Sequence, residues 1–471
     1  MVETGVQRLA RWVCDVDPSK VSGRSAALLK HSVLDAIGCA ILTLAEDCVQ
    51  PVLAYAKSVQ AAGQATLIGG GSAPVGLATL VNGTLIRAVD YNDHLAMDPN
   101  DGTKLGGHPS DHLAAILAIA EWQDRSGADV VAALLASYEL YGRVYKFLTA
   151  DLPWDHTTAF GMSIPAAAAR LLRLDHERTA NAIAISAAQA AALGVVRRGQ
   201  LSHSKFLASA LVAERGVEAA LLAAAGMTGP MTVFEDSRGI CRGIFRTDDG
   251  IDGLVAPLPP LPMIDGVTIK AFPGMDTSQA VAEAAIKTAG RRKLRADEID
   301  RVELVMNDHP MTRQQADDAD RRLPTSRETA DHSYYYMAAV ALLDGELTTR
   351  QFAAGRWSDP EVVELMRRIT IRLDPDWNIK APGGFPCRLR VVTKDGQEIV
   401  SEVAFATGHA RNKMSRAQVI DKFRRCVRGK IDDARADEII AAVDVLGDLN
   451  SIRELTRLLG TGSKAHTGGS H

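Results

Sequence analysis

Residues 252–265, DGLVAPLPPLPMID, separate two parts of the chain whose sequence patterns differ. Proline fixes φ and lacks a backbone N–H, so a proline-rich run interrupts both helices and strands. Before this run, apolar residues recur with helical spacing and β-branched alternation is nearly absent. After it, short alternating stretches lie between helical ones. Because 471 residues exceed what one hydrophobic core usually supports, we expect two domains.

The part before the proline-rich run is expected to be a bundle of packed helices. Residues 24–44 place apolar side chains at i, i+3, i+4 spacing around Val33 and Ile37. Alanine is abundant throughout this part, which lets helices approach one another closely. Further helices are expected at 110–124 (with Ser110 as N-cap and Gly127 after its end), 129–145, 177–193 and 205–226.

The part after the run is expected to be an α+β domain over residues 266–406. Alternating apolar and polar residues predict strands, and Asp395-Gly396 lies where two of them would form a hairpin. The helical pattern returns from Ser415 to Leu459, so the α+β part would be an insertion. Strands are expected at 299–306, 369–373, 387–393 and 398–404, and helices at 277–290 and 332–344.

The fold class is therefore mainly α, a large all-helical domain with an inserted smaller α+β domain. Residues 1–265 and 407–462 would form the helical domain, and the small, polar residues 463–471 a disordered tail.

Composition excludes several classes of function. The chain carries 53 basic and 57 acidic side chains, a net charge of −4, so a nucleic-acid partner is not expected. The six cysteines include no Cys-x-x-Cys pair, which argues against zinc or iron–sulfur sites. A carboxylate-rich substrate would be held by local cations and not by the overall charge.

The N-terminal sequence also bears on location. Residues 1–12, MVETGVQRLARW, lack the apolar core of a signal peptide. The most apolar stretches look interrupted by charge or glycine before the ~18 residues that a membrane span needs. A soluble, cytoplasmic protein with no membrane partner is expected.

The first polar cluster joins residues 90–94 (DYNDH) to residues 107–111 (GHPSD) through a polar, glycine-rich loop. The loop brings His108 to a helix start, where the helix dipole disfavours imidazolium and favours an anion. A neutral histidine near a carboxylate suits the removal of a proton beside a carboxyl group. The alternative is that Asp90, Asp93 and Ser110 cap helices and His108 lies in a turn.

Two further clusters precede apolar helices. Residues 154–158 (WDHTT) are a weak motif, since Thr and Asp are ordinary at helix starts. Residues 197–205 (RRGQLSHSK) place three cations beside a glycine turn and could clamp carboxylates, or form a solvated basic turn.

In the second part, Lys270 follows the boundary and could reach across a cleft between the domains. Residues 327–336 (RETADHSYYY) hold a tyrosine run, which is more often packing than catalysis. No phosphate-binding loop, His-Glu-x-x-His motif or serine nucleophile elbow is present in the sequence.

Together these clusters resemble the MmgE/PrpD family, which includes 2-methylcitrate dehydratase and cis-aconitate decarboxylase. The resemblance covers nearly the whole chain, and the motifs follow the family's order. They are AVDYND (88–93), GHPSD (107–111), WDHTT (154–158), LSHSK (201–205), IKAFP (269–273) and RETADHSYYYMAAVALLDG (327–345).

The resemblance implies a homodimeric lyase that needs no metal and no cofactor, with a cleft between the helical domain and a smaller α+β lid. One group would remove the proton next to a carboxylate of a small polycarboxylate, a second would protonate the leaving hydroxyl, and the lysines would hold carboxylates. The catalytic residues would be Asp90, His108, His156, Lys205, Lys270 and Tyr336, with Asp93, His94, Arg197, Arg198 and Ser202 binding substrate.

Three activities stay open at this point. A 2-methylcitrate dehydratase-like reaction leads, followed by a decarboxylase or epimerase, and by a catalytically silent helical binding protein. Two positions depart from the family pattern. His94 stands where Thr is common, and residues 274–277 (GMDT) stand where His or Cys is common. Both lie where substrate would be read.

Overall fold

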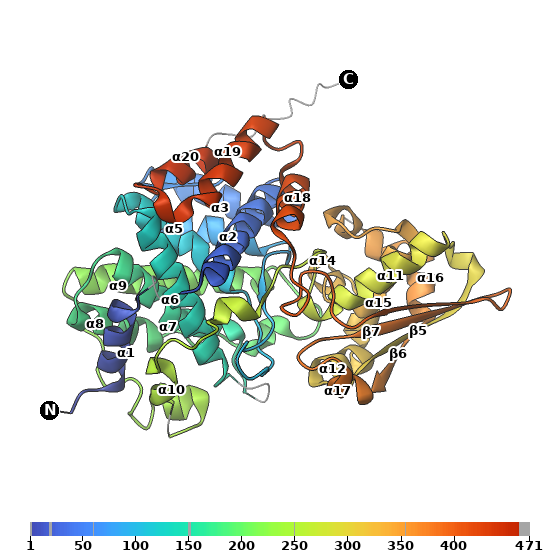
Figure 1. The fold of residues 1–471 in the computed structure, drawn as a ribbon, viewed down its shortest axis with the longest axis horizontal. Helices are drawn as coiled ribbons and strands as arrows, with labels where there is room; N and C mark the ends of the chain where they lie inside the picture. The colour runs from blue at the N-terminus through green and yellow to red at the C-terminus, as the bar shows by residue number, and fades with distance from the viewer. Residues whose placement is uncertain are drawn as a thin grey trace.

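The computed structural model describes residues 2–17, 21–59, 61–148, 152–248, 250–353 and 355–460. Helices dominate and strands are few and short, so the predicted mainly α fold is confirmed. Figure 1 shows a larger helical body and a smaller body built around a sheet. The predicted disordered tail, 463–471, lies outside the described residues.

The larger body contains the first and the last described helices. Its helices start where the sequence supplies capping groups. Ser126 Oγ, for example, accepts a hydrogen bond from Asp129 N (3.2 Å), and the Asp129 carboxylate accepts from Ser126 N (3.3 Å). The helices are α1 (Gly5–Asp15), α2 (Gly23–Thr43), α3 (Gln50–Val59), α4 (Val75–Arg87), α5 (His112–Trp122), α6 (Gly127–Tyr145), α7 (Phe160–Leu171), α8 (His176–Ala187), α9 (Ser204–Ala224), α10 (Ile251–Val255), α18 (Arg416–Val427), α19 (Asp433–Asp444) and α20 (Arg453–Gly460).

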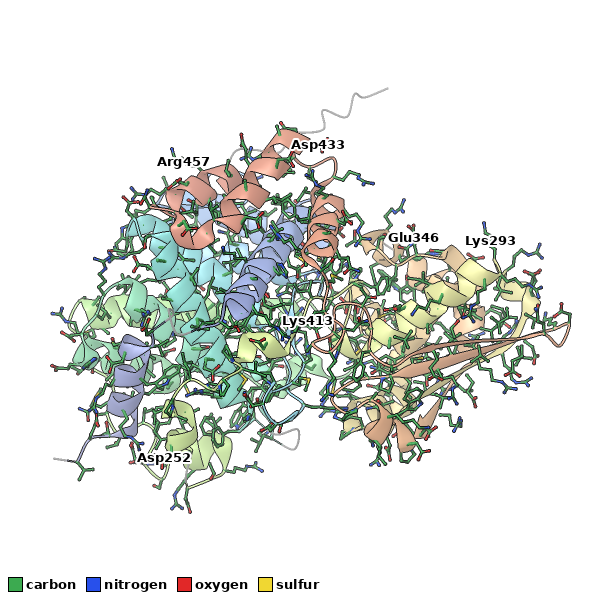
Figure 2. All side chains as sticks on the ribbon, viewed as in Figure 1. Asp252, Lys293, Glu346, Lys413, Asp433 and Arg457 are labelled. Atoms are coloured by element: carbon green, nitrogen blue, oxygen red, sulfur yellow. The ribbon has the colours of Figure 1, made fainter. Side chains whose placement is uncertain are left out.

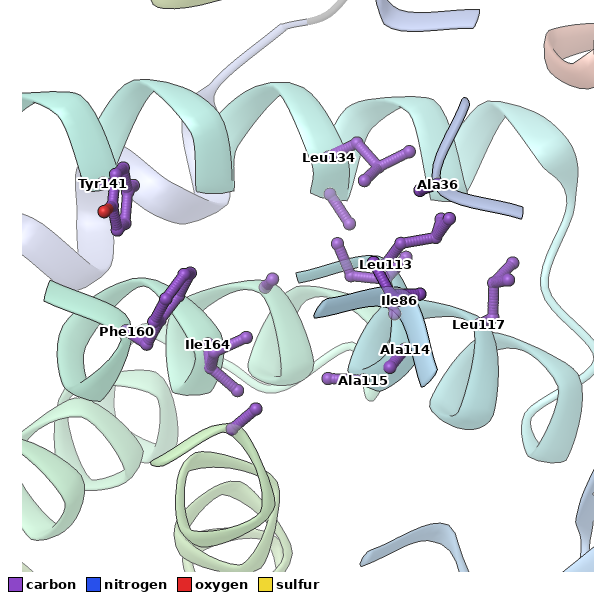
Figure 3. Close-up of a cluster of buried hydrophobic side chains, with 14 of the residues drawn as sticks. Ala36, Ile86, Leu113, Ala114, Ala115, Leu117, Leu134, Tyr141, Phe160 and Ile164 are labelled. Carbon is purple, nitrogen blue, oxygen red and sulfur yellow. The ribbon is translucent and has the colours of Figure 1, made fainter. Parts of the chain in front are cut away.

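The core of this body is alanine-rich, and small side chains bring its helices close together. Figure 3 shows alanines of α5 among larger apolar side chains of neighbouring helices. At Gly83, a Cβ would lie 3.2 Å from the Cβ of Ala210, so α4 and α9 pack almost backbone to backbone. Such packing fixes the ends of the helices, which carry the polar clusters, within narrow limits.

The smaller body has a four-stranded sheet in the order β6-β5-β7-β8. β5 pairs in parallel with β6 and antiparallel with β7, and β7 pairs antiparallel with β8. Alternate residues of β7 are buried, as the sequence pattern predicts. The strands are β5 (Ile299–Asn307), β6 (Ile369–Asp374), β7 (Cys387–Thr393) and β8 (Glu398–Val403); the helices are α11 (Gln279–Arg291), α12 (Pro310–Asp317), α13 (Ala319–Arg322), α14 (Arg327–Ala330), α15 (Tyr334–Asp344), α16 (Pro360–Arg367) and α17 (Asp376–Lys380).

Each body has its own hydrophobic core. The first takes its residues from Val6 to Ile269 and from Met414 to Leu459, and the second from Met275 to Ala406. The chain crosses between the bodies twice, and the crossings meet where Ile269 N donates to Gly408 O (3.0 Å). The exact domain boundaries and the role of the smaller body as a lid stay predictions.

Several local predictions were wrong. The larger body is not purely helical, because two pairs of two-residue strands occur in or beside it. The helix expected at 110–124 begins with a 3-10 turn at Pro109, so Ser110 lies inside that turn and does not cap α5. The helix expected to reach residue 193 ends at Ala187. The short strands are β1 (Ala65–Thr66) with β2 (Ser72–Ala73), and β3 (His94–Leu95) with β4 (Val267–Thr268).

The prediction that charge or glycine interrupts the most apolar stretches is wrong for helix α2. By length and composition it is long and apolar enough to cross a membrane, although the sequence pattern suggested an earlier interruption. In the structure, 67% of its most apolar window is buried inside the protein, as in the core helix of a globular body.

Candidate active site

Asp90 follows the end of α4 and lies between the two bodies. Its φ of 49° is in the left-handed region, which Asp tolerates better than most residues. The Asp90 carbonyl accepts hydrogen bonds from Gly274 N (3.1 Å) and from Lys270 Nζ (2.9 Å), both on the crossing into the smaller body. An uncommon backbone conformation held from outside in this way is often found at functional sites.

Three cations surround the Asp90 carboxylate, which is 1% exposed. Arg87 Nη1 lies 2.7 Å and Lys270 Nζ 2.5 Å from Oδ1, and Lys205 Nζ lies 3.1 Å from Oδ2. Burial opposes ionisation of Asp90, but Arg87, Lys205 and Lys270 outweigh it and hold the pKa of this carboxyl well below its usual range. Asp90 is therefore ionised at neutral pH.

The smaller body adds Asp331 and His332, between α14 and α15. Asp331 Oδ1 lies 2.7 Å from Lys205 Nζ and 2.6 Å from His332 Nδ1, while His332 Nε2 lies 3.6 Å from Asp90 Oδ2. Burial again opposes ionisation, yet Lys205 and His332 lower the pKa of Asp331 to about 2. Lys205 thus joins a carboxylate from each body.

His108 is held in one tautomer. Its Nδ1 lies 2.6 Å from the carbonyl oxygen of Asp93, which can only accept, so Nδ1 carries the hydrogen. The lone pair of the neutral ring is then on Nε2, 3.6 Å from Asp90 Oδ1. Burial, with Arg87 and Lys270 nearby, holds the pKa of His108 well below its usual range. The geometry presents His108 Nε2 as a proton acceptor beside an ionised carboxylate.

Gly107 and Asp93 build the turn that carries His108. Gly107 has φ +80°, and a Cβ there would lie 1.7 Å from the hydroxyl oxygen of Tyr141, so only glycine fits. Asp93 is fully buried and accepts hydrogen bonds from Ser110 N (3.0 Å) and from the Tyr138 hydroxyl (2.8 Å). The capping interpretation therefore describes Asp93 better than the predicted contact with substrate.

His156 begins a 3-10 turn (η4, His156–Ala159), and both of its ring nitrogens are occupied. Nε2 lies 2.9 Å from Arg197 Nη2, which only donates, so Nδ1 carries the hydrogen and donates to the Tyr141 hydroxyl (3.0 Å). Asp155 fixes Arg197 at 2.8 Å. Burial lowers the pKa of His156 to about 3. In this arrangement His156 has no lone pair free to accept a proton.

His94, in β3, faces the smaller body. Its Nδ1 lies 3.2 Å from Asp276 Oδ2, in the 3-10 turn η8 (Asp276–Ser278). The ring centroids of His94 and His108 are 5.4 Å apart, and those of His108 and His156 are 5.8 Å apart. The three imidazoles therefore form one row. His94 is one departure from the family pattern, Asp276 lies in the other (residues 274–277), and the two side chains contact each other.

Three predicted site residues lie apart from this cluster. Arg198 and Ser202 are exposed on the surface. Tyr336 is fully buried in the second core, where its hydroxyl donates to the Gln351 carbonyl and its ring lies 5.8 Å from Phe352. The Tyr336 side chain therefore packs in the second core, which is the more common role of tyrosines at a helix start.

Sequence reasoning missed four charged residues of the cluster. Arg87 is a lone cation in an otherwise apolar helical stretch, which is a signal for a buried partner. Asp155, Asp276 and Asp331 stand inside or beside the quoted motifs, but nothing in the sequence says which cation each one meets. The partners of Asp276 and Asp331 depend on how the two bodies meet, whereas Asp155 contacts Arg197 within the larger body.

The cluster has an excess of positive charge. Arg87, Lys205 and Lys270 face two ionised carboxylates, Asp90 and Asp331. Burial raises the pKa of the neighbouring Asp111 to about 7, so Asp111 does not bring a full negative charge at neutral pH. A buried surplus of cations suits a substrate that carries carboxylates.

One group of side chains has the geometry of a metal site. Asp90, Asp331 and His332 each offer a ligand atom, and these atoms lie within 4.8 Å of one another. The Lys205 ammonium group contacts oxygens of both carboxylates, so a fixed cation already balances their charge.

A surface cavity of about 620 Å³ lies at the outer end of the smaller body, around Lys293. Figure 2 labels this residue far from the junction between the bodies. The cavity lining, within the described residues, includes none of the Asp90 cluster. We therefore assign no part of the chemistry to it.

Comparison with known proteins gives matches along most of the chain. The model of the MmgE/PrpD N-terminal domain matches residues 7–250, and that of the MmgE/PrpD C-terminal domain matches residues 272–448. Cis-aconitate decarboxylase of Mus musculus is 26% identical over 452 residues, which cover 91% of this chain and 88% of the relative.

Dehydratases match over a shorter span. The mitochondrial 2-methylcitrate dehydratase of Yarrowia lipolytica is 25% identical over 389 residues, covering 76% of this chain and 71% of the relative. The 2-methylcitrate dehydratase of Escherichia coli (strain K12) is 25% identical over 380 residues, covering 73% of each chain.

Proposed function

Because the chain belongs to the MmgE/PrpD family, we propose that it is a lyase acting on a small hydroxy-polycarboxylate, with 2-methylcitrate as the leading substrate. The observation that carries this proposal is the buried group of three cations around Asp90, beside the free lone pair of His108. Such a site can hold carboxylates and accept a proton from the carbon next to one of them.

The reaction follows from this geometry. His108 Nε2 takes the proton from the carbon next to a carboxylate, and Asp90, 3.6 Å away, stabilises the imidazolium that forms. The electron pair of the broken C–H bond first moves onto the carboxylate, where Lys205 and Lys270 oppose the growing negative charge. It then forms the double bond while the hydroxyl on the adjacent carbon takes up a proton and leaves as water.

We further propose that this chemistry needs no metal and no cofactor. The ammonium groups of Lys205 and Lys270 supply the positive charge that a metal ion supplies in other hydro-lyases. Full activity after dialysis against a chelator is the expected result, and recovery of lost activity by one divalent ion would contradict it.

A second candidate activity is decarboxylation of cis-aconitate. The relatives named as decarboxylases cover 91% of this chain, whereas the named dehydratases cover 73% to 77%. Loss of carbon dioxide also leaves an electron pair next to a carboxylate, so the same cations serve both reactions.

Proton NMR of the chelator-treated protein in D₂O distinguishes the candidates. The substrates are 2-methylcitrate, citrate and cis-aconitate. An alkene product from 2-methylcitrate supports the dehydratase, and itaconate from cis-aconitate replaces it by the decarboxylase. Deuterium exchange without conversion points to an epimerase or another polycarboxylate. Unchanged spectra for all three overturn the proposed substrates and favour a silent binding protein of the same fold.

We also propose a soluble, cytoplasmic homodimer. Large apolar side chains are exposed beside and along α9, among them Leu193 (56%), Val195 (67%), Leu211 (44%) and Leu222 (47%). Leu211 and Leu222 are eleven residues apart and share one face of the helix, which suits an interface between copies. Light scattering at micromolar concentration tests the dimer, and a monomeric mass contradicts it.

A further inference from the structure

Elimination of water needs a second proton transfer, because hydroxide is a poor leaving group. Two evident donors are engaged elsewhere. His156 gives its ring hydrogen to Tyr141 and receives one from Arg197. Lys270 directs its three N–H bonds to the Asp90 carboxylate and to the carbonyls of Asp90 and Gly274.

His332 is also poorly suited. Asp331 accepts a hydrogen bond from Lys205 (2.7 Å) and also contacts His332 Nδ1 (2.6 Å). Burial and the neighbouring Lys205 lower the pKa of His332 to about 3. A neutral His332 would have to give up its only N–H, which Asp331 holds.

We propose that His94 donates this proton from Nε2 and that Asp276 is its positioning residue. This role rests on the proposed dehydratase function. Asp276 Oδ2 lies 3.2 Å from His94 Nδ1, and within the described residues no other cationic side chain forms an ion pair with Asp276. The negative charge of the Asp276 carboxylate is therefore not shared with another ion pair and can balance the positive charge of the His94 imidazolium.

The position of His94 suits the task. Its ring lies edge-on to His108 at 5.4 Å between centroids, so one substrate can reach both. The proton and the hydroxyl that leave stand on adjacent carbons, and each must come within about 3 Å of its partner. Among the described residues neither ring nitrogen of His94 forms a hydrogen bond, Nδ1 being in ionic contact with Asp276, and 13% of the side chain is exposed. Nε2 is therefore free to meet a substrate.

The contact also spans the two bodies. His94 belongs to β3 of the helical body, and Asp276 begins η8 at the start of the smaller one. Gly274, two residues earlier, has φ +113°, and a Cβ there would lie 2.9 Å from the Asp331 carbonyl. The turn at Gly274 thus places Asp276 next to His94, a few residues along the chain from Lys270, which contacts Asp90.

The second proton transfer leaves no atom or charge unaccounted for. Imidazolium Nε2–H of His94 gives its proton to the leaving oxygen, the C–O bond breaks, and water departs. The electron pair left by the proton that His108 took becomes the carbon–carbon double bond. His94 ends neutral with Nδ1 still 3.2 Å from Asp276 Oδ2 and takes up a proton from solvent before the next turnover, while His108 returns its own proton to solvent.

The test separates the two proton transfers. In D₂O, His94→Gln should exchange the substrate proton within about threefold of the wild-type rate, because His108 is intact. Formation of the alkene should fall by a factor of about 10² to 10⁴. Asp276→Asn should lower kcat for elimination with KM nearly unchanged, and Asp276→Glu should recover part of it. Unchanged elimination in His94→Gln, or a parallel loss of exchange, overturns the proposal.

His176→Gln is the matched control. His176 forms a similar contact with Asp15 at 3.7 Å, but both side chains are more than half exposed, so both rates should stay at wild-type values. A second measurement does not depend on turnover. ¹⁵N NMR of the histidine rings should show the hydrogen of neutral His94 on Nδ1 in the wild type. A bare Nδ1 overturns the role of Asp276, whereas a wild type that neither exchanges nor converts substrate overturns only the proposed function.

Discussion

The ion pairs around Asp90 and those on the outer face of β7 and β8 use the same chemical groups in opposite surroundings. On the sheet, Arg390 Nε lies 2.6 Å from Glu398, and Arg388 Nε lies 2.7 Å from Glu402, with every side chain at least 37% exposed. Around Asp90, the Lys205 and Lys270 side chains are at most 1% exposed. Distances alone do not distinguish the two sets, but burial does.

Because of this difference in burial, the exposed ion pairs serve solubility, whereas the buried ones suit chemistry. Exposed pairs are screened by water and contribute little to stability. Buried pairs cost desolvation energy that their mutual attraction rarely exceeds, so a protein that keeps several of them has another use for them. We expect substitutions in the two sets to differ accordingly.

The largest effect is expected for His108→Gln. The variant lacks the free Nε2, so both deuterium exchange and alkene formation should fall by a factor of about 10² to 10⁴. The thermal melt should stay near that of the wild type, since Asp93 still holds the turn through Ser110 and Tyr138. Retained exchange in this variant would remove His108 from its role.

Next in size is Lys205→Met. Loss of one charge-assisted contact should lower kcat/KM by a factor on the order of 10². The variant leaves Asp90 and Asp331 facing each other with less compensation, so the free energy of unfolding should fall by about 3–5 kcal/mol. Urea unfolding measures this loss, and the double variant Lys205→Met/Asp331→Asn should recover part of it. An unchanged urea midpoint in the single variant would contradict the pairing.

A smaller effect concerns pH. Burial lowers the pKa of His112, His156 and His332 to about 3, while an unfolded chain protonates them near 6.5. Between these values the unfolded state binds more protons, so the contribution of these three histidines to stability falls as pH falls below about 6.5 and is level above it. Each such histidine contributes up to about 1.4 kcal/mol per pH unit.

Urea unfolding between pH 5 and 8 measures this slope. In His332→Gln the slope of the free energy of unfolding against pH should be smaller by the contribution of one proton. In His176→Gln the slope should be unchanged, because the His176 side chain is 57% exposed. Equal slopes in the wild type and His332→Gln would show that His332 is protonated in the folded protein.

The smallest effect is expected for Arg390→Ala. Its partner Glu398 stays in water, so both the urea midpoint and kcat/KM should equal those of the wild type. A clear loss in this variant would erase the contrast between the two sets of ion pairs.

Periodicity in the sequence was enough to predict the framework. The helices around 24–44 and 205–226 and the strands of the sheet lie within one or two residues of their predicted bounds, because burial of one face determines both patterns. Element ends were less predictable. Pro109 starts a turn that displaces Ser110 from the capping position, and the helix after His176 stops at Ala187 although an alanine-rich sequence continues.

The candidate site was predicted only in part. Asp90, His108, Lys205 and Lys270 were expected there and do meet, but the partners that fix their charge were not expected. Arg87 pairs with Asp90 inside the larger body, whereas Asp331 comes from the smaller body, so its contact with Lys205 depends on the angle at which the bodies pack. Tyr336 shows the converse, since a motif residue can serve the core.

Helix α18 is synthesised late, and this order has a consequence for the folding of the nascent chain. This helix lies against α2, where Lys422 Nζ is 2.5 Å from Asp35 and a Cβ at Gly38 would lie 3.0 Å from the ring of Phe423. During synthesis, all residues of the smaller body are made before α18 leaves the ribosome. Until then the part of α2 that faces α18 is uncovered and Asp35 lacks its partner Lys422, and transiently exposed surface of this kind is what chaperones protect.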